Sequence, residues 1–307
     1  MSDLATTISL MTEIFLGREA LGDGLPRHEL RRWYKRVFRG VYVPKNATLT
    51  LPDRTVGAWL TSDRRGVIAG VAASALHGAL WVDATEPIEL LADERRRQPG
   101  LQIRMDRFRQ DEVTTIADLP VTTAARTAFD LGRHHPRALA MGRLDALMRA
   151  APFHVADVEM LIDRYGPVRG VRQLRELLPL VDGGAQSLPE SSLRLMLIDN
   201  GFAVPQTQIP GHDGEGLIGF LDLGWPDLGL AVEYDGDQHR RDRRQYLKDR
   251  RRIPRFEAQD WEILIFVKED TPSEVIARTY EAYTRRGGSE IDDLAWVTRA
   301  YAPKRRF

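Results

Sequence analysis

Three acidic residues lie in two neighbouring apolar segments of the C-terminal third of the chain. Glu233 and Asp235 close the segment Leu228 to Asp235, and Asp222 stands near the end of the preceding segment, Leu217 to Leu223. Alternate side chains of a strand share one face, so Glu233 and Asp235 project together and Asp222 can reach the same corner. Convergent carboxylates repel one another unless a cation neutralises them, and oxygen donors favour magnesium or manganese. The sequence therefore predicts a Mg²⁺ or Mn²⁺ site built on Asp222 and Glu233.

The composition limits the other kinds of chemistry. The chain of 307 residues contains no cysteine, which excludes disulfides, thiolate metal sites and cysteine nucleophiles. With 43% hydrophobic and 29% charged residues it can bury a sizeable core, and its length favours about two or three domains. Its longest apolar run, Val67 to Leu76, is shorter than the roughly 18 residues that span a bilayer, and Met1-Ser2-Asp3 lacks a basic signal-peptide head. We expect a cytoplasmic protein without membrane contact.

The charge is zero overall but unevenly distributed. Residues 240–255 contain nine Lys or Arg against two Asp, and residues 26–39 contain six against one Glu. Such compact basic blocks in an otherwise acidic chain are typical of surfaces that bind a phosphate backbone. A solvated arginine-rich helix face is the alternative for each block.

Caps, breakers and apolar periodicity predict the elements around the acids. Ser187 caps a helix with Glu190 at its third position, so Glu190 is either a capping acid or part of the site. Further on, the pattern predicts strands at 204–209, 217–223 and 228–235, a helix at 239–253 that Pro254 ends or interrupts, a strand at 261–267, and a helix after the capping box Thr271 to Glu274. The predicted order is α-β-β-β-α-β-α.

This segment resembles a known nuclease-related family. The carrying residues are Asp222, the run Glu233-Tyr234-Asp235-Gly236-Asp237-Gln238-His239, the run Asp242 to Tyr246, Lys248-Asp249, and Trp261. They resemble the actinobacterial branch of the uncharacterised domain family related to very-short-patch-repair endonucleases, within the PD-(D/E)xK nuclease superfamily. The resemblance covers residues 187–287 and implies a restriction-endonuclease-like αβββαβ core that hydrolyses phosphodiester bonds.

The resemblance also implies roles for individual residues. Asp222 would be the central metal ligand, with Glu233 and the carbonyl of Tyr234 as further oxygens, and Glu190 would be the accessory acid. His239 and Gln238 would position water or phosphate. The basic residues of the following helix would track the DNA backbone: Arg240, Arg243, Arg244 and Lys248.

One position departs from the family pattern. The superfamily's lysine, two residues after the second acid, is replaced by Asp235. Lys248 or His239 would have to supply the missing function, and Lys248 is slightly favoured. Alternatively, Asp235-Gly236 is simple turn chemistry and His239 an ordinary surface residue at a helix start.

The first fifty residues predict a DNA-binding module. Leu4, Ile8, Met11 and Phe15 have helical spacing, and a second helix from Pro26 would point Leu30 and Trp33 inward before a strand pair at 37–44. The basic residues of that helix would face outward: Arg27, His28, Arg31, Arg32 and Lys35. With Arg39-Gly40-Val41-Tyr42, this region resembles the N-terminal domain of abortive-infection type antitoxins. The resemblance implies a winged helix-turn-helix in which these basic residues contact DNA.

The middle of the chain offers no evident chemistry. An apolar helix is expected around 67–80, a strand at 88–91, helices from 152 to 180, and a linker at 181–185. Arg126 and Asp130 have the i, i+4 spacing of a structural ion pair on a helix, and His77 is expected to be packed and hydrogen-bonded.

We therefore predict an α/β multidomain protein. Its parts are a winged helix-turn-helix (1–50), an antitoxin-type α/β domain (51–150), a helical connector and linker (151–186), a PD-(D/E)xK nuclease-like domain (187–288) and a tail (289–307). The predicted function is a metal-dependent DNA endonuclease brought to DNA by its N-terminal module. The alternative is a DNA-binding transcriptional regulator or antitoxin whose nuclease-like domain is catalytically silent. An RNA substrate and a homodimer both stay open.

Overall fold

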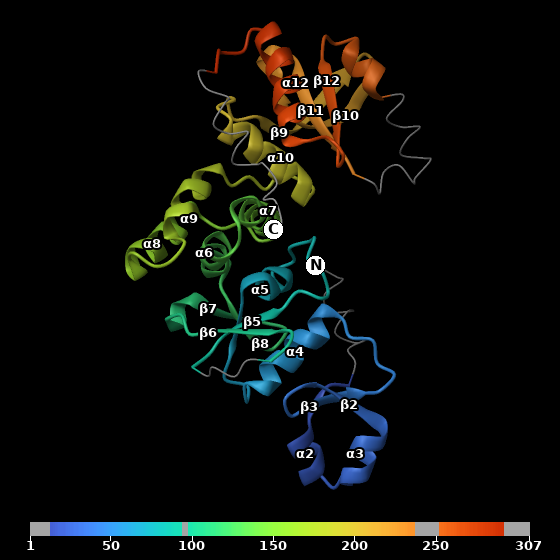
Figure 1. The fold of residues 1–307 in the computed structure, drawn as a ribbon, viewed down its shortest axis with the longest axis vertical. Coiled ribbons are helices and arrows are strands. Elements are labelled where there is room, and N and C mark those ends of the chain that lie inside the picture. The colour runs from blue at the N-terminus through green and yellow to red at the C-terminus, as the bar shows by residue number, and fades with distance from the viewer. Residues whose placement is uncertain (1–12, 94–97, 237–251, 292–307) are drawn as a thin grey trace, which may run out of the picture. The chain divides into compact units, whose positions relative to one another are not determined.

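Mixed helices and sheets make up the chain, as expected for an α/β multidomain protein (Figure 1). The structure is a computed structural model, and it describes residues 13–93, 98–236 and 252–291. These residues fall into two compact units. Unit 1 comprises Met1–His135 and Leu147–Val181, and unit 2 comprises Pro136–Ala146 and Asp182–Phe307.

A three-stranded antiparallel sheet begins unit 1. Its order is β1 (Phe15–Leu16), β3 (Val41–Pro44), β2 (Tyr34–Phe38), and it is accompanied by α2 (Gly17–Gly22) and α3 (Arg27–Trp33). The expected strand pair is confirmed. The turn between β2 and β3 contains Gly40 at φ +76°, a conformation that glycine adopts without steric cost.

Two expectations for this region were wrong. Phe15 lies in a strand rather than a helix, because it pairs with Tyr42 and its ring packs edge-on against that of Tyr34, with centroids 5.0 Å apart. Leu4, Ile8 and Met11 lie outside the described residues. Trp33 does not point inward with Leu30: it is 56% exposed, because α3 ends there and Tyr34 continues in extended conformation.

A five-stranded mixed sheet forms the centre of unit 1, in the order β6-β5-β4-β8-β7. Its strands are β4 (Val67–Ala69), β5 (Ile88–Leu91), β6 (Leu101–Arg104), β7 (Val113–Ile116) and β8 (Leu119–Thr122). Its helices are α4 (Leu51–Thr61), α5 (Gly70–Leu76), α6 (Ala124–His134), α8 (Val155–Tyr165) and α9 (Val171–Leu177), with short 3-10 turns η1 (Gln110–Glu112) and η2 (Leu178–Leu180). Helix α4 contacts both sheets, and one apolar core joins them.

The helix expected around 67–80 is a strand followed by a helix. Val67 and Ile68 are buried in β4, between β5 and β8, where β-branched side chains pack well. Gly70 then turns the chain into α5 at φ +56°, and a Cβ there would lie 2.2 Å from the carboxylate of Glu89.

Unit 2 is built on a four-stranded sheet in the order β12-β11-β10-β9. Its strands are β9 (Gln206–Asp213), β10 (Gly216–Trp225), β11 (Leu230–Asp235) and β12 (Glu262–Val267), with the 3-10 turn η3 (Pro226–Leu228) between β10 and β11. Strand β10 pairs antiparallel with both β9 and β11, whereas β12 runs parallel to β11. The helices are α10 (Leu188–Asp199) and α12 (Pro272–Arg285), together with helical residues 252–257 before β12.

Pro254 does not end the helix that precedes β12, contrary to expectation, because residues 252–257 are helical through it. The rest of the expected helix lies outside the described residues. Of the two expected capping boxes, the one at α12 is confirmed and the one at α10 forms only in half. Thr271 and Glu274 bond reciprocally at α12, whereas at α10 Ser187 accepts from the Glu190 N–H while the Glu190 carboxylate bonds elsewhere.

Packing on the sheet of unit 2 leaves one corner for polar groups. Helices α10 and α12 cover one face through an apolar cluster that includes Leu197, Val232 and Ile276. The neighbouring strand residue Ala231 belongs to a second cluster, with Phe256. Alternate residues of β11 therefore face different layers, as a strand requires.

Helix α7 (Arg137–Ala150) begins in unit 2 and ends in unit 1. The expected linker at 181–185 does contain the boundary between the units, after Val181. It is nevertheless packed: Ala185 is fully buried, and the Asp182 N–H donates to the Asp145 carboxylate at 2.8 Å.

Candidate functional site

Glu190, Asp222 and Glu233 converge in unit 2, and we call these three residues the acidic site. Strands β10 and β11 pair through Leu223 and Val232, so the next residues outward along the two strands are Asp222 and Glu233. Glu190 comes from the first turn of α10, and Glu190 and Glu233 are each 7% exposed. The register thus places Asp222 beside Glu233, and Asp222 interacts electrostatically with both Glu190 and Glu233.

The electrostatics at Asp222 follow from this convergence. Burial, and then the negative charges of Glu190 and Glu233, raise the pKa of Asp222 to about 7. A hydrogen bond from the Tyr234 N–H and the charge of Arg252 offset part of that rise. Asp222 is thus a carboxylate whose charge is poorly compensated by the protein alone.

Glu190 has a structural task as well as a place in the site. Its N–H donates to the Ser187 hydroxyl at 3.2 Å, and its Oε2 accepts from the Gln186 N–H at 2.7 Å. These bonds fix the carboxylate at the start of α10, within electrostatic reach of Asp222. The two expected roles of Glu190, cap and site acid, are compatible.

Arg252 is a cation at the acidic site. Its Nη1 and Nη2 donate to the two carboxylate oxygens of Glu233 at 2.8 and 2.7 Å, and Nη1 also donates to the Phe220 carbonyl at 2.6 Å. The guanidinium lies 5.9 Å from the centre of the Phe256 ring. Sequence reasoning missed this residue, because Arg252 is one of nine basic residues in its block.

Several expected site residues cannot be placed. Gln238, His239, Arg240, Arg243, Arg244 and Lys248 lie outside the described residues. Asp235 is the last residue of β11 and is partly buried. The Tyr234 side chain packs against the apolar core, and its N–H bonds to Asp222.

The acids of the site do not gather tightly around one point. Over the described residues, one group of three ligand-type side chains has donor atoms all within 4.8 Å of one another, and it lies in unit 1: Asp106, Asp130 and His134. At the acidic site, the hold of Arg252 on Glu233 gives a physical reason for the looser arrangement.

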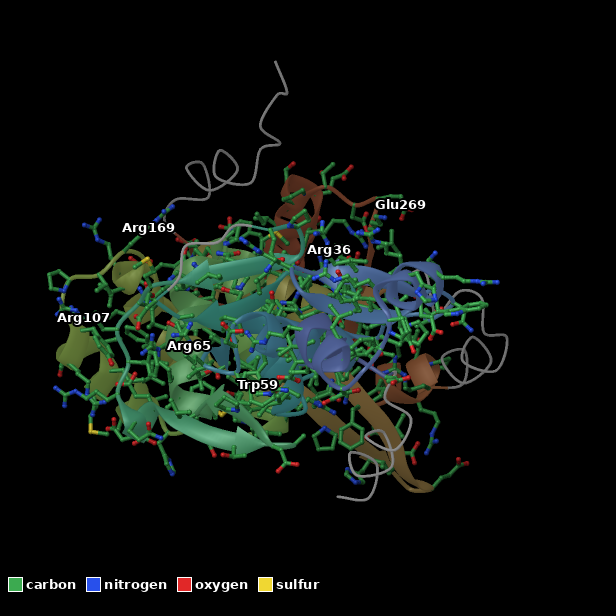
Figure 2. The ribbon with its side chains drawn as sticks, turned by 90° about the horizontal axis from the view of Figure 1, so that it is seen from below. Arg36, Trp59, Arg65, Arg107, Arg169 and Glu269 are labelled. Atoms are coloured by element: carbon green, nitrogen blue, oxygen red, sulfur yellow. The ribbon has the colours of Figure 1, made fainter. Side chains whose placement is uncertain are left out.

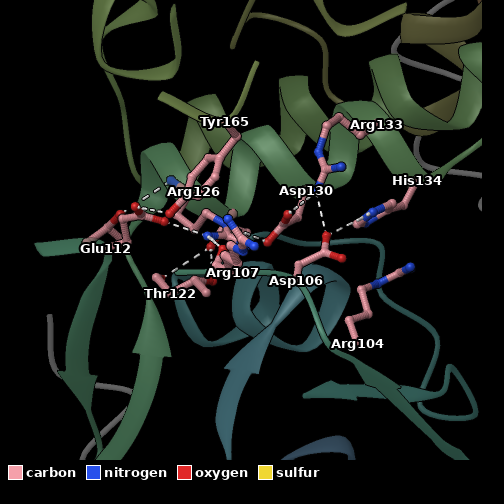
Figure 3. A network of polar contacts seen from close by, with 12 residues as sticks. Arg104, Asp106, Arg107, Glu112, Thr122, Arg126, Asp130, Arg133, His134 and Tyr165 are labelled. Atoms are coloured by element: carbon pink, nitrogen blue, oxygen red, sulfur yellow. Dashed lines mark hydrogen bonds and ion pairs between the residues drawn. The ribbon is translucent and has the colours of Figure 1, made fainter. Parts of the chain in front are cut away.

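The group in unit 1 belongs to an arginine network (Figure 3). Arg133 donates to Asp106 at 2.7 Å and to Asp130 at 3.0 Å, and Arg126 pairs with Asp130 at 3.0 Å. Hydrogen bonds from His134 and Arg133 hold the pKa of Asp106 far below its usual range. Guanidinium groups already neutralise these carboxylates, so the network is structural. The predicted Arg126–Asp130 ion pair is confirmed.

His77 is packed and hydrogen-bonded, as predicted. Its Nε2 lies 2.7 Å from the Thr122 carbonyl, and burial lowers its pKa. It therefore stabilises the junction between α5 and β8 and offers no ligand.

The N-terminal basic residues are exposed on and beside α3: Arg27, His28, Arg31, Arg32 and Lys35. The Arg32 guanidinium stacks on the Trp33 ring at 4.8 Å, and Lys35 donates to the Ala47 carbonyl at 2.7 Å. Exposed arginines also occur elsewhere in unit 1, including Arg65, Arg107 and Arg169 (Figure 2). Exposure alone therefore does not single out α3, whereas the density of basic residues does.

Comparison with known proteins gives two relatives that are described as uncharacterised. Two proteins of Mycobacterium tuberculosis, from strains CDC 1551 / Oshkosh and ATCC 25618 / H37Rv, are each 28% identical to this chain over 239 residues. The similarity covers 78% of this chain and 87% of each relative, and both are described as uncharacterised. No family model matches the chain. None of the described helices combines the length and apolarity needed to cross a membrane.

Proposed function

We propose that the chain is a metal-dependent endonuclease that hydrolyses phosphodiester bonds of DNA at the acidic site. The observation that carries the proposal is the placement of Asp222 and Glu233 side by side on paired strands, with Glu190 near enough for its charge to help raise the pKa of Asp222. A carboxylate so placed gains from a divalent cation, which offsets most of the negative charge of the three acids. The oxygen donors and the absence of cysteine fit Mg²⁺ or Mn²⁺.

The arrangement of unit 2 supports this proposal. The order α10, β9, β10, β11, helical residues 252–257, β12 supports the proposal, because the resemblance implies an αβββαβ core. In the proposed site Asp222 and Glu233 hold the cation, the Tyr234 carbonyl adds an oxygen, and Glu190 orients water. A bound divalent ion would polarise the phosphate and lower the pKa of a water molecule. Water would then add to phosphorus and the bridging P–O bond would break, leaving a phosphate monoester and a hydroxyl group.

Unit 1 would bring the enzyme to DNA. We propose that α2, α3, β2 and β3 form a winged helix-turn-helix whose basic residues contact the backbone of cytoplasmic DNA. Helix α3 has only seven residues, so the basic residues on it and on β2 act together as one surface. The contacting residues would be Arg27, Arg31, Arg32 and Lys35.

A second candidate function rests on a specific observation. Arg252 holds both carboxylate oxygens of Glu233, and Asp235 replaces the superfamily's lysine. These features also suit a DNA-binding regulator or antitoxin whose nuclease-like unit no longer cuts.

Cleavage assays separate the two candidates. Purified protein is incubated with single-stranded, duplex and mismatched DNA, and with RNA of the same sequence, in Mg²⁺ or Mn²⁺. We expect DNA cleavage that Asp222→Asn abolishes and that Asp227→Asn, which changes an exposed acid of η3, leaves intact. Cutting that survives Asp222→Asn would remove the proposed site. Binding to DNA without cleavage in either metal would favour the regulator, and cleavage of RNA alone would change the substrate.

A further inference from the structure

Groups of unit 2 hold the Arg252 guanidinium in a defined position, which we call the Arg252 seat. Two bonds go to Glu233 and one to the Phe220 carbonyl, and the Phe256 ring lies beneath the guanidinium. Gly219 leaves room for the side chain, since a Cβ there would approach Arg252 Cδ to 3.1 Å. These groups form a binding site for a cation, and the bound cation is a side chain of the same protein.

The contact between Arg252 and Glu233 competes with metal binding at Glu233. A paired, two-bond contact with arginine uses both carboxylate oxygens and places a fixed positive charge next to them. A divalent ion on the same carboxylate would be repelled by that charge. Glu233 therefore cannot bind both Arg252 and a metal ion at full strength at the same time.

A DNA phosphate is an alternative partner for Arg252. Its side chain is 19% exposed, compared with 9% for the Glu233 side chain, so Arg252 is the more solvent-accessible member of the pair. It belongs to the most basic block of the sequence, residues 240–255, which is suited to a phosphate backbone. Guanidinium groups bind phosphate through the same two-bond geometry that they use with carboxylate.

We propose that Arg252 is an exchangeable counter-ion, which leaves Glu233 for a DNA phosphate and so opens the acidic site to a divalent cation. The inference rests on the proposed metal site and adds a coupling to it. DNA and metal then bind cooperatively, because each favours the state in which Arg252 has left Glu233. Without DNA, Arg252 closes the site.

Manganese binding tests the coupling directly. The full chain is titrated with Mn²⁺ at low salt, and the electron paramagnetic resonance signal of free Mn²⁺ is recorded with and without a DNA duplex. A duplex of about 20 base pairs is used, because this length exceeds the reach of one small DNA-binding module. We expect the duplex to tighten Mn²⁺ binding by wild type about 5-fold to 150-fold, the usual range of such coupling. Arg252→Gln should bind Mn²⁺ more tightly without DNA, and the duplex should add little further.

Three controls make the result specific. Arg137→Gln removes another two-bond arginine pair of unit 2, to Asp199 at 3.0 and 2.8 Å, outside the basic block, and should behave like wild type. Asp222→Asn with duplex corrects for Mn²⁺ bound by DNA alone. Arg252→Lys keeps the charge without the fork and should fall between wild type and Arg252→Gln. Arg252→Lys also takes the place of Arg252→Gln as the test variant if circular dichroism shows that Arg252→Gln is unfolded.

The outcomes distinguish this inference from the proposed function. If Asp222→Asn leaves Mn²⁺ binding unchanged, the metal site itself is wrong and the exchange is wrong with it. If Asp222→Asn abolishes binding but neither Arg252 variant tightens it, the metal site stands and the exchange is overturned.

Discussion

Arg194 of α10 donates to both carboxylate oxygens of Asp145 on α7, at 3.1 and 3.0 Å, with 1% and 0% of the two side chains exposed. Asp145 also accepts the Asp182 N–H. This buried pair ties α10 to the start of unit 2, and the first turn of α10 carries Glu190. The position of one acid therefore depends on an ion pair at a distance from the site.

Breaking this ion pair on one side should destabilise unit 2. Arg194→Met leaves the Asp145 charge buried without its partner, and we expect a loss of about 3 to 5 kcal/mol in the free energy of unfolding. Arg194→Met combined with Asp145→Leu should recover part of that loss. Glu281→Ala, which removes an exposed partner of Arg285, should change stability by less than about 1 kcal/mol. Urea denaturation measures all three, and equal effects for Arg194→Met and Glu281→Ala would contradict the assignment.

The raised pKa of Asp222 makes stability depend on pH. A carboxyl group with a pKa of about 7 when folded and about 3.8 when unfolded binds more protons in the folded state, so its effect on stability becomes less favourable as pH rises through that window. Asp222→Asn removes the ionisation. We expect this variant to gain on wild type between pH 5 and pH 8.5 by an amount on the order of 1 to 3 kcal/mol. Urea unfolding at the two pH values without metal checks it, and a difference that does not change with pH would refute the shift.

Close packing under the Arg252 seat should be sensitive to one methyl group. A Cβ at Gly211 would lie 1.9 Å from Phe256 Cε1, whereas a Cβ at Gly214 would meet nothing within 4 Å. Gly211→Ala should therefore cost about 1 to 3 kcal/mol and shift Phe256. Gly214→Ala should be neutral or stabilising by up to about 1 kcal/mol. Thermal and urea unfolding of the pair provide the test, and a neutral Gly211→Ala would show that Phe256 is not held as described.

Salt dependence should identify the DNA surface of unit 1. If Arg31 contacts a phosphate, Arg31→Ala makes the negative slope of log K against log salt shallower by about 0.9. Arg169→Ala removes an equally exposed arginine of the same unit and should leave the slope unchanged. Fluorescence anisotropy with a labelled duplex at several salt concentrations measures both. Equal effects would show that binding is spread over the surface and not concentrated on α3.

Much of unit 2 could be predicted from local signals. Caps, prolines and alternating apolar residues predict α10, β10, β11, β12 and α12, and alternation along β11 predicts that Glu233 and Asp235 project toward the corner that Asp222 can reach. Arg252 could not be singled out, because a run of basic residues carries no local signal that says which one turns toward an acid. That choice depends on Gly219, the Phe220 carbonyl and Glu233, which are distant from Arg252 in sequence.

The errors in unit 1 have physical causes of the same kind. Helical spacing suggested that Trp33 packs beside Leu30, but the helix ends at Trp33, and Tyr34 in β2 contacts Phe15 instead. Around Val67 the apolar run has the composition of a buried helix or a buried strand, and pairing with β5 and β8 decides for the strand. Tertiary pairing overrides spacing in both cases.

Anomalous X-ray scattering from crystals grown with Mn²⁺ and a DNA duplex tests the central claim most directly. The account predicts a manganese peak coordinated by carboxylate oxygens of both Asp222 and Glu233, with the Arg252 guanidinium displaced from Glu233. A map without a peak at these two residues, or with manganese bound only to Asp106, Asp130 and His134 of unit 1, would contradict it.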